Sequence, residues 1–284
     1  MPDGNRSPIV LSVVIPALNE EKSILATLDR LVDQDAVDEI IVVDNGSTDE
    51  TRDLVEKYIV TSPKVRLLDE PRRGLPFARN TGFDAARGEF IGRTDADTLV
   101  FPNWGETIRT YLADNPEVGA VTGITTYHDS PVGFLLRLGY WIQDRRGALG
   151  NRVGNLHGPN MGIRRTAWLE VRDQTITGVP VAEDLDLALC LIKKQLPIQQ
   201  LKDLRADTSA RRRRATPREW WRFQQTGLNT LRGQGFWVLP LHRRVIVGAW
   251  LAHTVQWPIY LFWDFEARRF TLRRTGTRIS SIGH

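Results

Sequence analysis

The segment FIGRTDADT, residues 90–98, is the most informative part of this chain. An apolar run ends there at two aspartates, Asp95 and Asp97, which are separated by one residue. Ligands of open α/β sheets bind beyond the carboxyl ends of the strands, so the segment predicts two carboxylates at a binding edge. A carboxylate in that position can hold a hard divalent cation that also contacts substrate phosphates. Aspartates also favour turns for purely local reasons, so the rest of the sequence has to decide.

Strand-like and helix-like segments alternate on both sides of this turn. Apolar, mostly β-branched runs predict strands at residues 9–15, 39–43, 65–68, 89–93 and 118–122. Apolar residues at helical spacing predict helices at residues 20–32, 76–86, 103–114 and 182–194. Pro16 is expected to end the first strand, and Ser47 and Glu50 have the spacing of a capping box before a further helix. The alternation predicts an α/β fold in which a mostly parallel, Rossmann-like sheet carries helices on both faces.

The composition is that of an ordinary globular protein, with 41% hydrophobic and 25% charged residues in a chain of 284. A single cysteine, Cys190, lies in an apolar helical pattern and is expected to serve packing. One cysteine allows no internal disulfide and indicates a reducing compartment. The N-terminal sequence lacks a basic stretch followed by an apolar one, so we expect no secretory signal and a cytoplasmic location.

Acidic residues follow three of the predicted strands, at Glu20, at Asp44 and at the Asp95–Asp97 pair. The carboxyl ends of parallel strands meet at one edge of a sheet, so we expect these side chains to converge. Asp44 can hydrogen-bond a base or ribose, although it also fits a simple turn. Glycine-rich phosphate loops, zinc-binding spacings and a nucleophile elbow are absent from the sequence. A nucleotide site would therefore rely on carboxylates, backbone groups and a metal ion.

Four segments of the sequence, taken together, are similar to a known family. They are VVIPALNEE (13–21), IIVVDNGSTDET (40–51), GLPFARNTGFDAARGEFIGRTDADT (74–98) and AEDLDLAL (182–189). In this order they resemble the family 2 glycosyltransferases, which have the GT-A fold. The resemblance covers residues 12–98 and resumes over residues 158–187. It implies that the first half of the chain binds a nucleotide sugar.

The resemblance also implies roles for individual residues. Those implied to line the nucleotide are Pro16, Leu18 and Glu20, with Asp44 at the base. Those implied to belong to a loop closing over the nucleotide are Arg79 and Asn80. Asp95 would face the ribose and diphosphate, and Asp97 would ligate Mn²⁺ or Mg²⁺. Many members have a further acid after this pair, where the present chain has Thr98 and so lacks a supporting carboxylate.

The adjacent acids Glu183 and Asp184 match the acidic catalytic pair of that family. In a single inverting displacement the acceptor hydroxyl has to lose its proton as it attacks the anomeric carbon, which requires a general base. We assign the base to Asp184, at the start of a predicted helix, where the helix dipole would keep the carboxylate ionised. Acids at a helix N-terminus also occur as a simple start signal.

The segment HGPNMG, residues 157–162, resembles the acceptor side of the family. Gly158, Pro159 and Asn160 would let the backbone approach the donor sugar, or they would form an ordinary turn. The Q-x-x-R-W motif of polymerising members is absent from the sequence. We therefore expect transfer of a single sugar.

The C-terminal part of the chain is basic and rich in tryptophan. Residues 205–278 contain fifteen arginines and four acidic residues, and residues 245–263 carry no formal charge. We interpret this region as a helix pair at an anionic membrane surface, which suits a lipid or lipid-linked acceptor. A lid packed on the core and a true membrane span are the alternatives. Nucleic acid is not an expected partner, because no recognised binding module is present.

These observations predict a catalytic domain at residues 1–205, with a nucleotide-sugar half (1–123) and an acceptor half (124–205), followed by a helical region at 206–284. The predicted activity is inverting, metal-dependent transfer of one sugar from a nucleoside-diphosphate sugar to a lipid-linked or glycan acceptor. We expect it at the cytoplasmic membrane face, in cell envelope biosynthesis. The alternatives are a sugar-1-phosphate nucleotidyltransferase and a non-catalytic nucleotide-sugar-binding or membrane scaffold protein.

Overall fold

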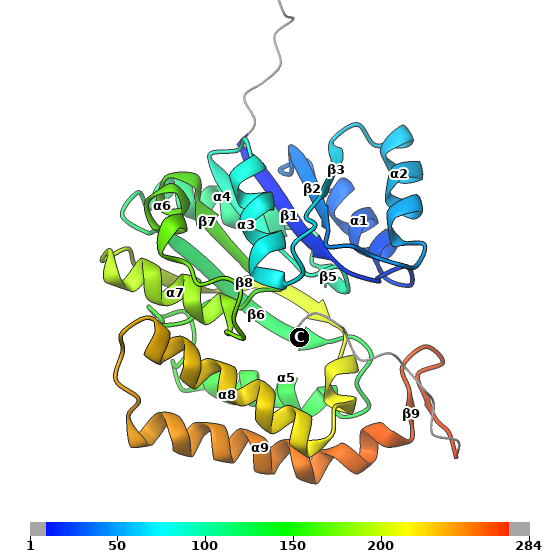
Figure 1. Cartoon of the computed structure of the whole chain (residues 1–284), viewed down its shortest axis with the longest axis vertical. Coiled ribbons are helices and arrows are strands. Elements are labelled where there is room, and N and C mark those ends of the chain that lie inside the picture. Colours follow the sequence, from blue (N-terminus) through cyan, green and yellow to red (C-terminus); the bar gives the residue numbers. More distant parts are fainter. Residues whose placement is uncertain (1–9, 273–284) are drawn as a thin grey trace, which may run out of the picture.

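The computed structural model of the chain describes residues 10–272 (Figure 1). The strands of the main sheet are β1 (Leu11–Ala17), β2 (Glu39–Asp44), β3 (Val65–Asp69), β4 (Phe90–Arg93), β5 (Thr98–Val100), β6 (Ala120–Tyr127), β7 (Met161–Arg164) and β8 (Ile198–Thr208). The α-helices are α1 (Ile24–Val32), α2 (Thr51–Thr61), α3 (Leu75–Ala85), α4 (Trp104–Asp114), α5 (Gly133–Arg145), α6 (Arg165–Val171), α7 (Glu183–Lys193), α8 (Pro217–Gly233) and α9 (Pro240–Leu261). The structure also contains the 3₁₀ turns η1 (Arg172–Gln174) and η2 (Arg211–Arg214) and a hairpin of β9 (Trp263–Asp264) and β10 (Arg269–Phe270).

An eight-stranded sheet forms the centre of the molecule, in the order β3-β2-β1-β4-β7-β6-β8-β5. The strands β3, β2, β1 and β4 run parallel, as expected for strands that are joined by helices. β7 runs antiparallel to both of its neighbours, β4 and β6, and β5 runs antiparallel to β8 at the far edge. The carboxyl ends of β1, β2 and β4 therefore meet at one edge of the sheet.

Helices cover both faces of this sheet (Figure 1). Val13 of β1 belongs to the hydrophobic core on one face, together with Trp104 of α4. Val14, the next residue, belongs to the core on the other face, together with Phe83 of α3 and Trp168 of α6. Successive side chains of a strand point to opposite faces, so the continuous apolar run of β1 results from burial on both sides. The predicted α/β class is confirmed.

Two local predictions for the first half are wrong. β1 continues through Pro16 instead of ending there. Pro16 has no N–H to donate to a neighbouring strand. No hydrogen bond between β1 and β4 is lost for this reason, because the pairing of these two strands stops at Val14. Ser47 and Glu50 form no capping box, since the N-cap Glu50 has no side-chain cap and the Ser47 hydroxyl accepts the N–H of Asn19 at 2.9 Å.

The middle of the chain, residues 124–180, gave no firm prediction and contains α5, β7 and α6. β6 runs through residue 123 and β8 runs through residue 205, where the predicted divisions of the chain fall. The sheet is therefore continuous across both positions. The division into a nucleotide-sugar half, an acceptor half and a helical region stays a prediction.

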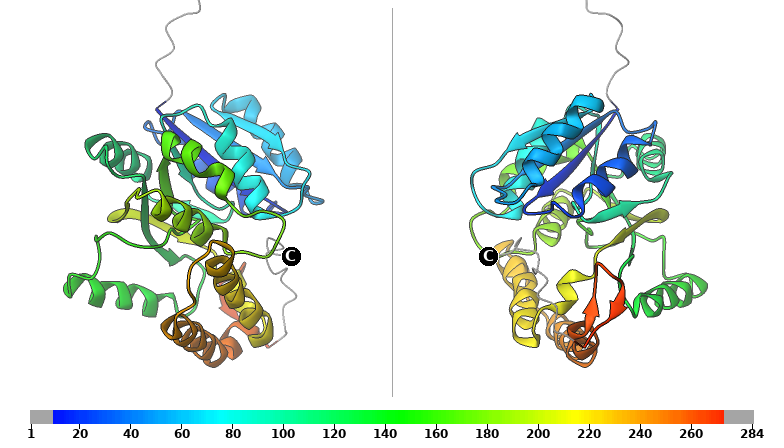
Figure 2. Two further views of the ribbon diagram at one scale, coloured as in Figure 1. Left: turned by 60° about the vertical axis from the view of Figure 1, so that its left-hand side comes forward. Right: turned by 90° about the vertical axis from the view of Figure 1, so that its right-hand side faces the viewer.

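The helices α5, α8 and α9 lie at the end of the molecule opposite α1 to α4 (Figures 1 and 2). A capping box of Thr216 and Glu219 starts α8. The ring of Trp220 on α8 stacks on that of His253 on α9, with 4.3 Å between the ring centroids. Within residues 10–272, each helix is too short or too polar to cross a membrane.

Candidate active site

A cavity of about 710 Å³ opens at the carboxyl ends of β1 and β4, a volume typical of small-molecule sites. Five acidic side chains from three separate segments line it: Glu20, Asp95, Asp97, Glu183 and Asp184. Residues 209–213 of the C-terminal region and aromatic residues of α8 also line the cavity. The fold thus brings the two acidic pairs that the sequence singled out, 95/97 and 183/184, into one cavity.

Glu183 lies buried between two buried arginines. Its Oε2 is 2.9 Å from Nη1 of Arg79, and its Oε1 is 2.5 Å from Nη1 of Arg93. Burial alone would raise the pKa of Glu183, but Arg93 and Arg79 outweigh burial and lower it. A carboxylate held ionised by two guanidinium groups is a poor proton acceptor. Glu183 instead fixes the start of α7 against α3 and β4.

Gly158 leaves the space that Arg93 needs. A Cβ on Gly158 would come within 2.2 Å of Nη1 of Arg93, so a side chain here would displace the guanidinium. Through its backbone N–H, Gly158 also faces Oδ2 of Asp184 at 3.5 Å. The glycine therefore allows the approach of Asp184 and Arg93 to the same turn.

Asp184 lines the cavity beside Glu183, in the first turn of α7. Its Oδ1 accepts the backbone N–H of Leu185 at 2.8 Å. Burial, followed by the charge of Glu183, raises the pKa of Asp184, and His157 opposes this shift. Burial therefore outweighs the helix dipole in the direction of the shift, and the expectation that the dipole keeps Asp184 ionised stays a prediction. A carboxylate with a raised pKa accepts a proton more readily.

His157 is a cavity residue that the sequence analysis did not single out. Its Nδ1 lies 3.0 Å from the hydroxyl of Thr125, and its backbone N–H donates to Thr122 at 3.0 Å. Loss of hydration around its ring lowers the pKa of His157, and the charge of Asp184 opposes this shift. The sequence offered one signal that could have identified His157: it lies directly before Gly158, in the segment that resembles the acceptor side of the family.

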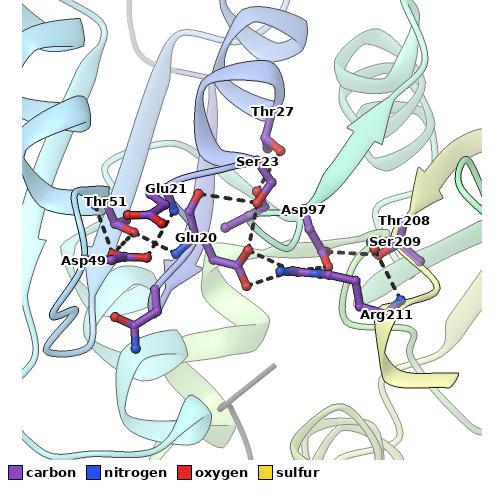
Figure 3. A network of polar contacts seen from close by, with 12 residues as sticks. Glu20, Glu21, Ser23, Thr27, Asp49, Thr51, Asp97, Thr208, Ser209 and Arg211 are labelled. Atoms are coloured by element: carbon purple, nitrogen blue, oxygen red, sulfur yellow. Dashed lines mark hydrogen bonds and ion pairs between the residues drawn. The ribbon is translucent and has the colours of Figure 1, made fainter. Parts of the chain in front are cut away.

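Asp95 and Asp97 follow β4 and differ in their partners. Asp95 Oδ1 lies 2.9 Å from Nη2 of Arg93. Burial raises the pKa of Asp95 to about 6; Arg93 opposes this shift and Asp97 adds to it. Asp97 Oδ2 lies 2.6 Å from Nη2 of Arg211, and its Oδ1 accepts the hydroxyl of Thr208 at 3.1 Å (Figure 3).

Glu20 completes this acidic edge. Its two carboxylate oxygens accept from Nη2 of Arg211 at 3.0 and 2.8 Å, and its Oε2 accepts the hydroxyl of Ser23 at 2.7 Å (Figure 3). Burial raises the pKa of Glu20, and Arg211 works against that effect. Two carboxylates and one guanidinium therefore share this part of the cavity.

The chemistry of these side chains fits a divalent cation with few protein ligands. Among residues 10–272, no three or more His, Cys, Asp or Glu side chains gather as a metal cage. Magnesium-like ions commonly take one or two carboxylates and complete their shell with phosphate oxygens and water. Asp97 offers such a carboxylate at the cavity wall, with Glu20 on the far side of the same guanidinium. A cation at Asp97 would have to share or replace the contact with Arg211.

Three residues implied to bind the nucleotide do not reach this cavity. Pro16, Leu18 and Asp44 are buried and lie outside the described lining of the cavity. The Asp44 carboxylate accepts the backbone N–H of Ser47 at 3.1 Å and so stabilises its own turn. The turn explanation of Asp44 thus has a geometric basis, and its contact with a base stays a prediction.

Arg79 and Asn80 lie in helix α3, so the implied placement in a loop is wrong. Pro76 and the apolar spacing that follows start a helix here, and tertiary packing buries its inner face. Arg79 binds Glu183, and Asn80 accepts from Nε of Arg79 at 2.9 Å and donates to Thr175 at 3.0 Å. In the structure, Arg79 holds the Glu183 carboxylate and Asn80 holds the Arg79 guanidinium.

The buried side chain of Asn160 connects strands β6 and β8 with helix α4. Its side-chain amide donates to the carbonyl groups of Ile124 and Leu204 at 3.1 and 3.0 Å, and its Oδ1 accepts from Trp104 at 2.8 Å. The side chain is fully buried and therefore turned away from a ligand. Pro159 and Gly158, in contrast, line the cavity.

Comparison with known proteins agrees with this fold and this cavity. The model of the family described as Glycosyl transferase family 2 matches residues 12–171, more than half of the chain. Hyaluronan synthase of Pasteurella multocida is 33% identical over 190 residues, which are 66% of this chain and 19% of that protein. The uncharacterized glycosyltransferase YibD of Escherichia coli (strain K12) is 36% identical over 106 residues, 37% of this chain and 31% of that protein. The chain thus spans about a fifth to a third of the length of these relatives.

Solved structures of low sequence identity share the fold. The mannosyltransferase PcManGT from Pyrobaculum calidifontis, in complex with GDP-Man and Mn²⁺, has a TM-score of 0.63 and 24% identity, over 87% of this chain and 72% of that one. Glucosyl-3-phosphoglycerate synthase from Mycobacterium tuberculosis, with Mn²⁺, UDP and phosphoglyceric acid, has a TM-score of 0.57 and 21% identity, over 81% of this chain and 80% of that one. The fold and the acidic cavity define a glycosyltransferase of the GT-A type. The chain belongs to glycosyl transferase family 2.

Proposed function

We propose that this glycosyltransferase moves a single sugar, with inversion, from a nucleoside-diphosphate sugar to an acceptor hydroxyl. The convergence of Asp97 and Asp184 on one cavity carries the proposal. One carboxylate serves the diphosphate end of the donor, and the other faces the acceptor. Two solved structures of the same fold that hold GDP-Man or UDP together with Mn²⁺ support a donor of this class.

Asp184 acts as the general base in this proposal. It takes the proton of the acceptor hydroxyl while the oxygen attacks the anomeric carbon and the bond from that carbon to the diphosphate breaks. The nucleoside diphosphate leaves with the bonding electrons. General-base catalysis of this kind contributes about 10²–10⁴ in rate. Arg93 and Glu183 position Asp184 through the first turn of α7.

The leaving diphosphate requires positive charge at the other end of the cavity. When bound at Asp97, Mn²⁺ or Mg²⁺ supplies that charge. Arg211, which contacts Asp97, adds to the positive potential there. Asp95, ion-paired with Arg93, keeps the turn between β4 and β5 in register with the base.

We further propose that α5 and α9 bring the enzyme to an anionic membrane surface, where a lipid-linked or glycan acceptor is presented at the cytoplasmic face. On α5, Phe134, Leu138 and Trp141 share one side at helical spacing and are 57%, 49% and 56% exposed. On α9, Val245 and Val255 are 62% and 78% exposed. Exposed apolar patches of this kind mark interaction surfaces.

Charge supports a lipid surface over a protein partner. Arginines at 137, 145 and 146 of α5 and its C-terminal end and at 243 and 244 of α9 accompany the apolar side chains, and all five are exposed. Basic residues that flank an apolar helical face suit acidic headgroups. Both helices lie at the same end of the molecule (Figure 2).

Donor binding and catalysis are tested separately. Nucleoside diphosphates are screened with and without Mn²⁺ by thermal shift, where a preferred nucleotide raises Tm with ligand concentration. Hydrolysis of the matching labelled nucleotide sugar is then compared in the native enzyme and in Asp184→Asn. We expect retained nucleotide binding and a loss of turnover of about 10²–10⁴ in the variant. Release of pyrophosphate from a nucleoside triphosphate and a sugar 1-phosphate, without hydrolysis of the nucleotide sugar, would instead identify a nucleotidyltransferase. Full activity of the variant would remove Asp184 as the base.

A further inference from the structure

Arg211 brings a positive charge into the acidic edge of the cavity (Figure 3). Its Nη2 contacts both carboxylate oxygens of Glu20 and Oδ2 of Asp97, with distances between 2.6 and 3.0 Å. Burial disfavours the charged guanidinium, but Asp97 and Glu20 outweigh burial and raise the pKa of Arg211. The carboxylate proposed to hold a metal ion therefore already has a cation of the chain beside it.

The backbone before Arg211 is fixed by a separate carboxylate. Asp129, which is buried, accepts the hydroxyl of Ser209 at 2.6 Å and the N–H of Ala210 at 2.7 Å. These two bonds set the direction in which the chain enters η2. The fold thus fixes the backbone of Arg211 beside the acidic edge. The guanidinium can exchange one carboxylate partner for another by movement of the side chain alone.

The guanidinium is held through one of its nitrogens. All three contacts converge on Nη2, whereas Nε is buried and has no hydrogen-bond partner among residues 10–272. Arginine pairs most strongly through two parallel N–H bonds to one carboxylate. The contact of Arg211 with Asp97 is therefore weaker than a pair of parallel bonds to one carboxylate. When that contact is broken, the contacts of Arg211 with Glu20 can remain.

We propose that Arg211 and the divalent cation compete for the Asp97 carboxylate, so that Arg211 sets the affinity of the donor-free enzyme for the metal. The proposal rests on the proposed function of the cavity as a donor site. Two cations cannot share Asp97 Oδ2 without strong repulsion at such short range. The metal therefore binds weakly to the free enzyme. It binds well only together with a diphosphate, whose oxygens add negative charge and further ligands.

The test measures Mn²⁺ binding without nucleotide, from the paramagnetic resonance signal of the free ion. We expect Arg211→Gln to bind Mn²⁺ at least about tenfold more tightly than the native protein, because a charge-assisted hydrogen bond no longer has to be broken. Arg212→Gln is the matched control. It removes the same charge from the same cavity, but the Arg212 guanidinium lies over the ring of Phe223 at 4.8 Å and contacts neither Asp97 nor Glu20. For this control we expect a change of no more than about twofold.

Each remaining outcome decides the proposal. Unchanged Mn²⁺ affinity in Arg211→Gln, or an equal gain in Arg212→Gln, overturns it. The gain has to disappear in the double variant Arg211→Gln/Asp97→Asn; its persistence shows that another carboxylate binds the ion. If Arg211→Gln does not fold, Arg211→Met, which also removes the cation, decides in its place by the same tenfold criterion. Nucleotide binding by the native protein is measured separately, so failure of the donor site is distinguishable from failure of the competition.

Discussion

Residues 10–123, which we propose to bind the donor and call the donor half, bury most of their apolar strand residues, whereas the C-terminal end leaves many apolar side chains exposed. Every residue of β1 and β2 is buried. By contrast, α5 buries one of its 13 residues, Gly133, and α9 buries three of 22. Apolar side chains favour burial, and most of those on these two helices are not buried within the protein. The first region forms a closed core, whereas the second leaves apolar side chains exposed.

Charge follows the same division. The donor half places Glu20 and Asp97 beyond strand ends, and Arg211 of the C-terminal region pairs with both carboxylates at the cavity. The two regions therefore meet where the proposed chemistry takes place. The predictions below test whether the ion pairs belong to the core, whether the apolar end belongs to a membrane, and whether the base lies where the two regions meet.

The largest expected effect concerns the ion pairs of Glu183. In Glu183→Gln the guanidinium groups of Arg79 and Arg93, which are 0% and 1% exposed, lose their common carboxylate. We expect the free energy of unfolding to fall by about 3–5 kcal/mol, because the buried charge of Arg79 loses its carboxylate and Arg93 keeps only its pair with Asp95. Urea denaturation measures this change.

The matched control for that variant is Glu170→Gln. Glu170 lies 3.8 Å from Lys194, and both side chains are well exposed. A surface pair of this kind contributes about 0–1 kcal/mol. Equal, small losses in both variants would contradict the structural role assigned to Glu183.

The apolar end of the molecule is tested with vesicles that contain phosphatidylserine. We expect Leu138→Glu on α5 to weaken partitioning of the protein onto the vesicles by about tenfold. The substitution replaces apolar area that would be buried in the lipid with a charge that anionic lipid repels. Val60→Glu on α2 is the control, because Val60 is an exposed apolar residue (84%) of the opposite region. Sedimentation with vesicles gives the bound fraction. If both variants bind as the native protein does, or if the native protein does not bind, the membrane proposal is wrong.

The smallest expected effect is a shift of the pH profile. Asp184 accepts a proton only when ionised, so kcat/KM for donor hydrolysis falls as the pH drops through its pKa. Burial and the charge of Glu183 raise that pKa, so we place the acidic limb above the ordinary aspartate value of 3.8. The pKa of Glu183 is lowered from 4.5 in spite of burial, because Arg93 and Arg79 favour its ionised form. A limb below pH 3.8 would therefore contradict Asp184 as the base.

Much of the donor half was predictable because its signals are local. A β-branched run such as that of β2 predicts a strand buried on both faces, and the observed strand begins at Glu39 as expected and ends one residue later, at Asp44. The Asp95–Asp97 turn follows β4 directly, so its place at the carboxyl edge comes from the order of the chain. Cys190, expected to serve packing, is fully buried in α7.

The amino-acid sequence alone was enough to establish the α/β class, the family and the acidic residues of the cavity, since these depend on periodicity and on neighbours along the chain. Tertiary structure decided which acid is held by arginines, Glu183, and which has a raised pKa, Asp184. It also brought Arg211 to Asp97 across 114 residues of sequence and left the apolar side of α5 uncovered. Contacts between distant segments and the exposure of a helix face depend on how the elements pack, and no local pattern of residues encodes that packing.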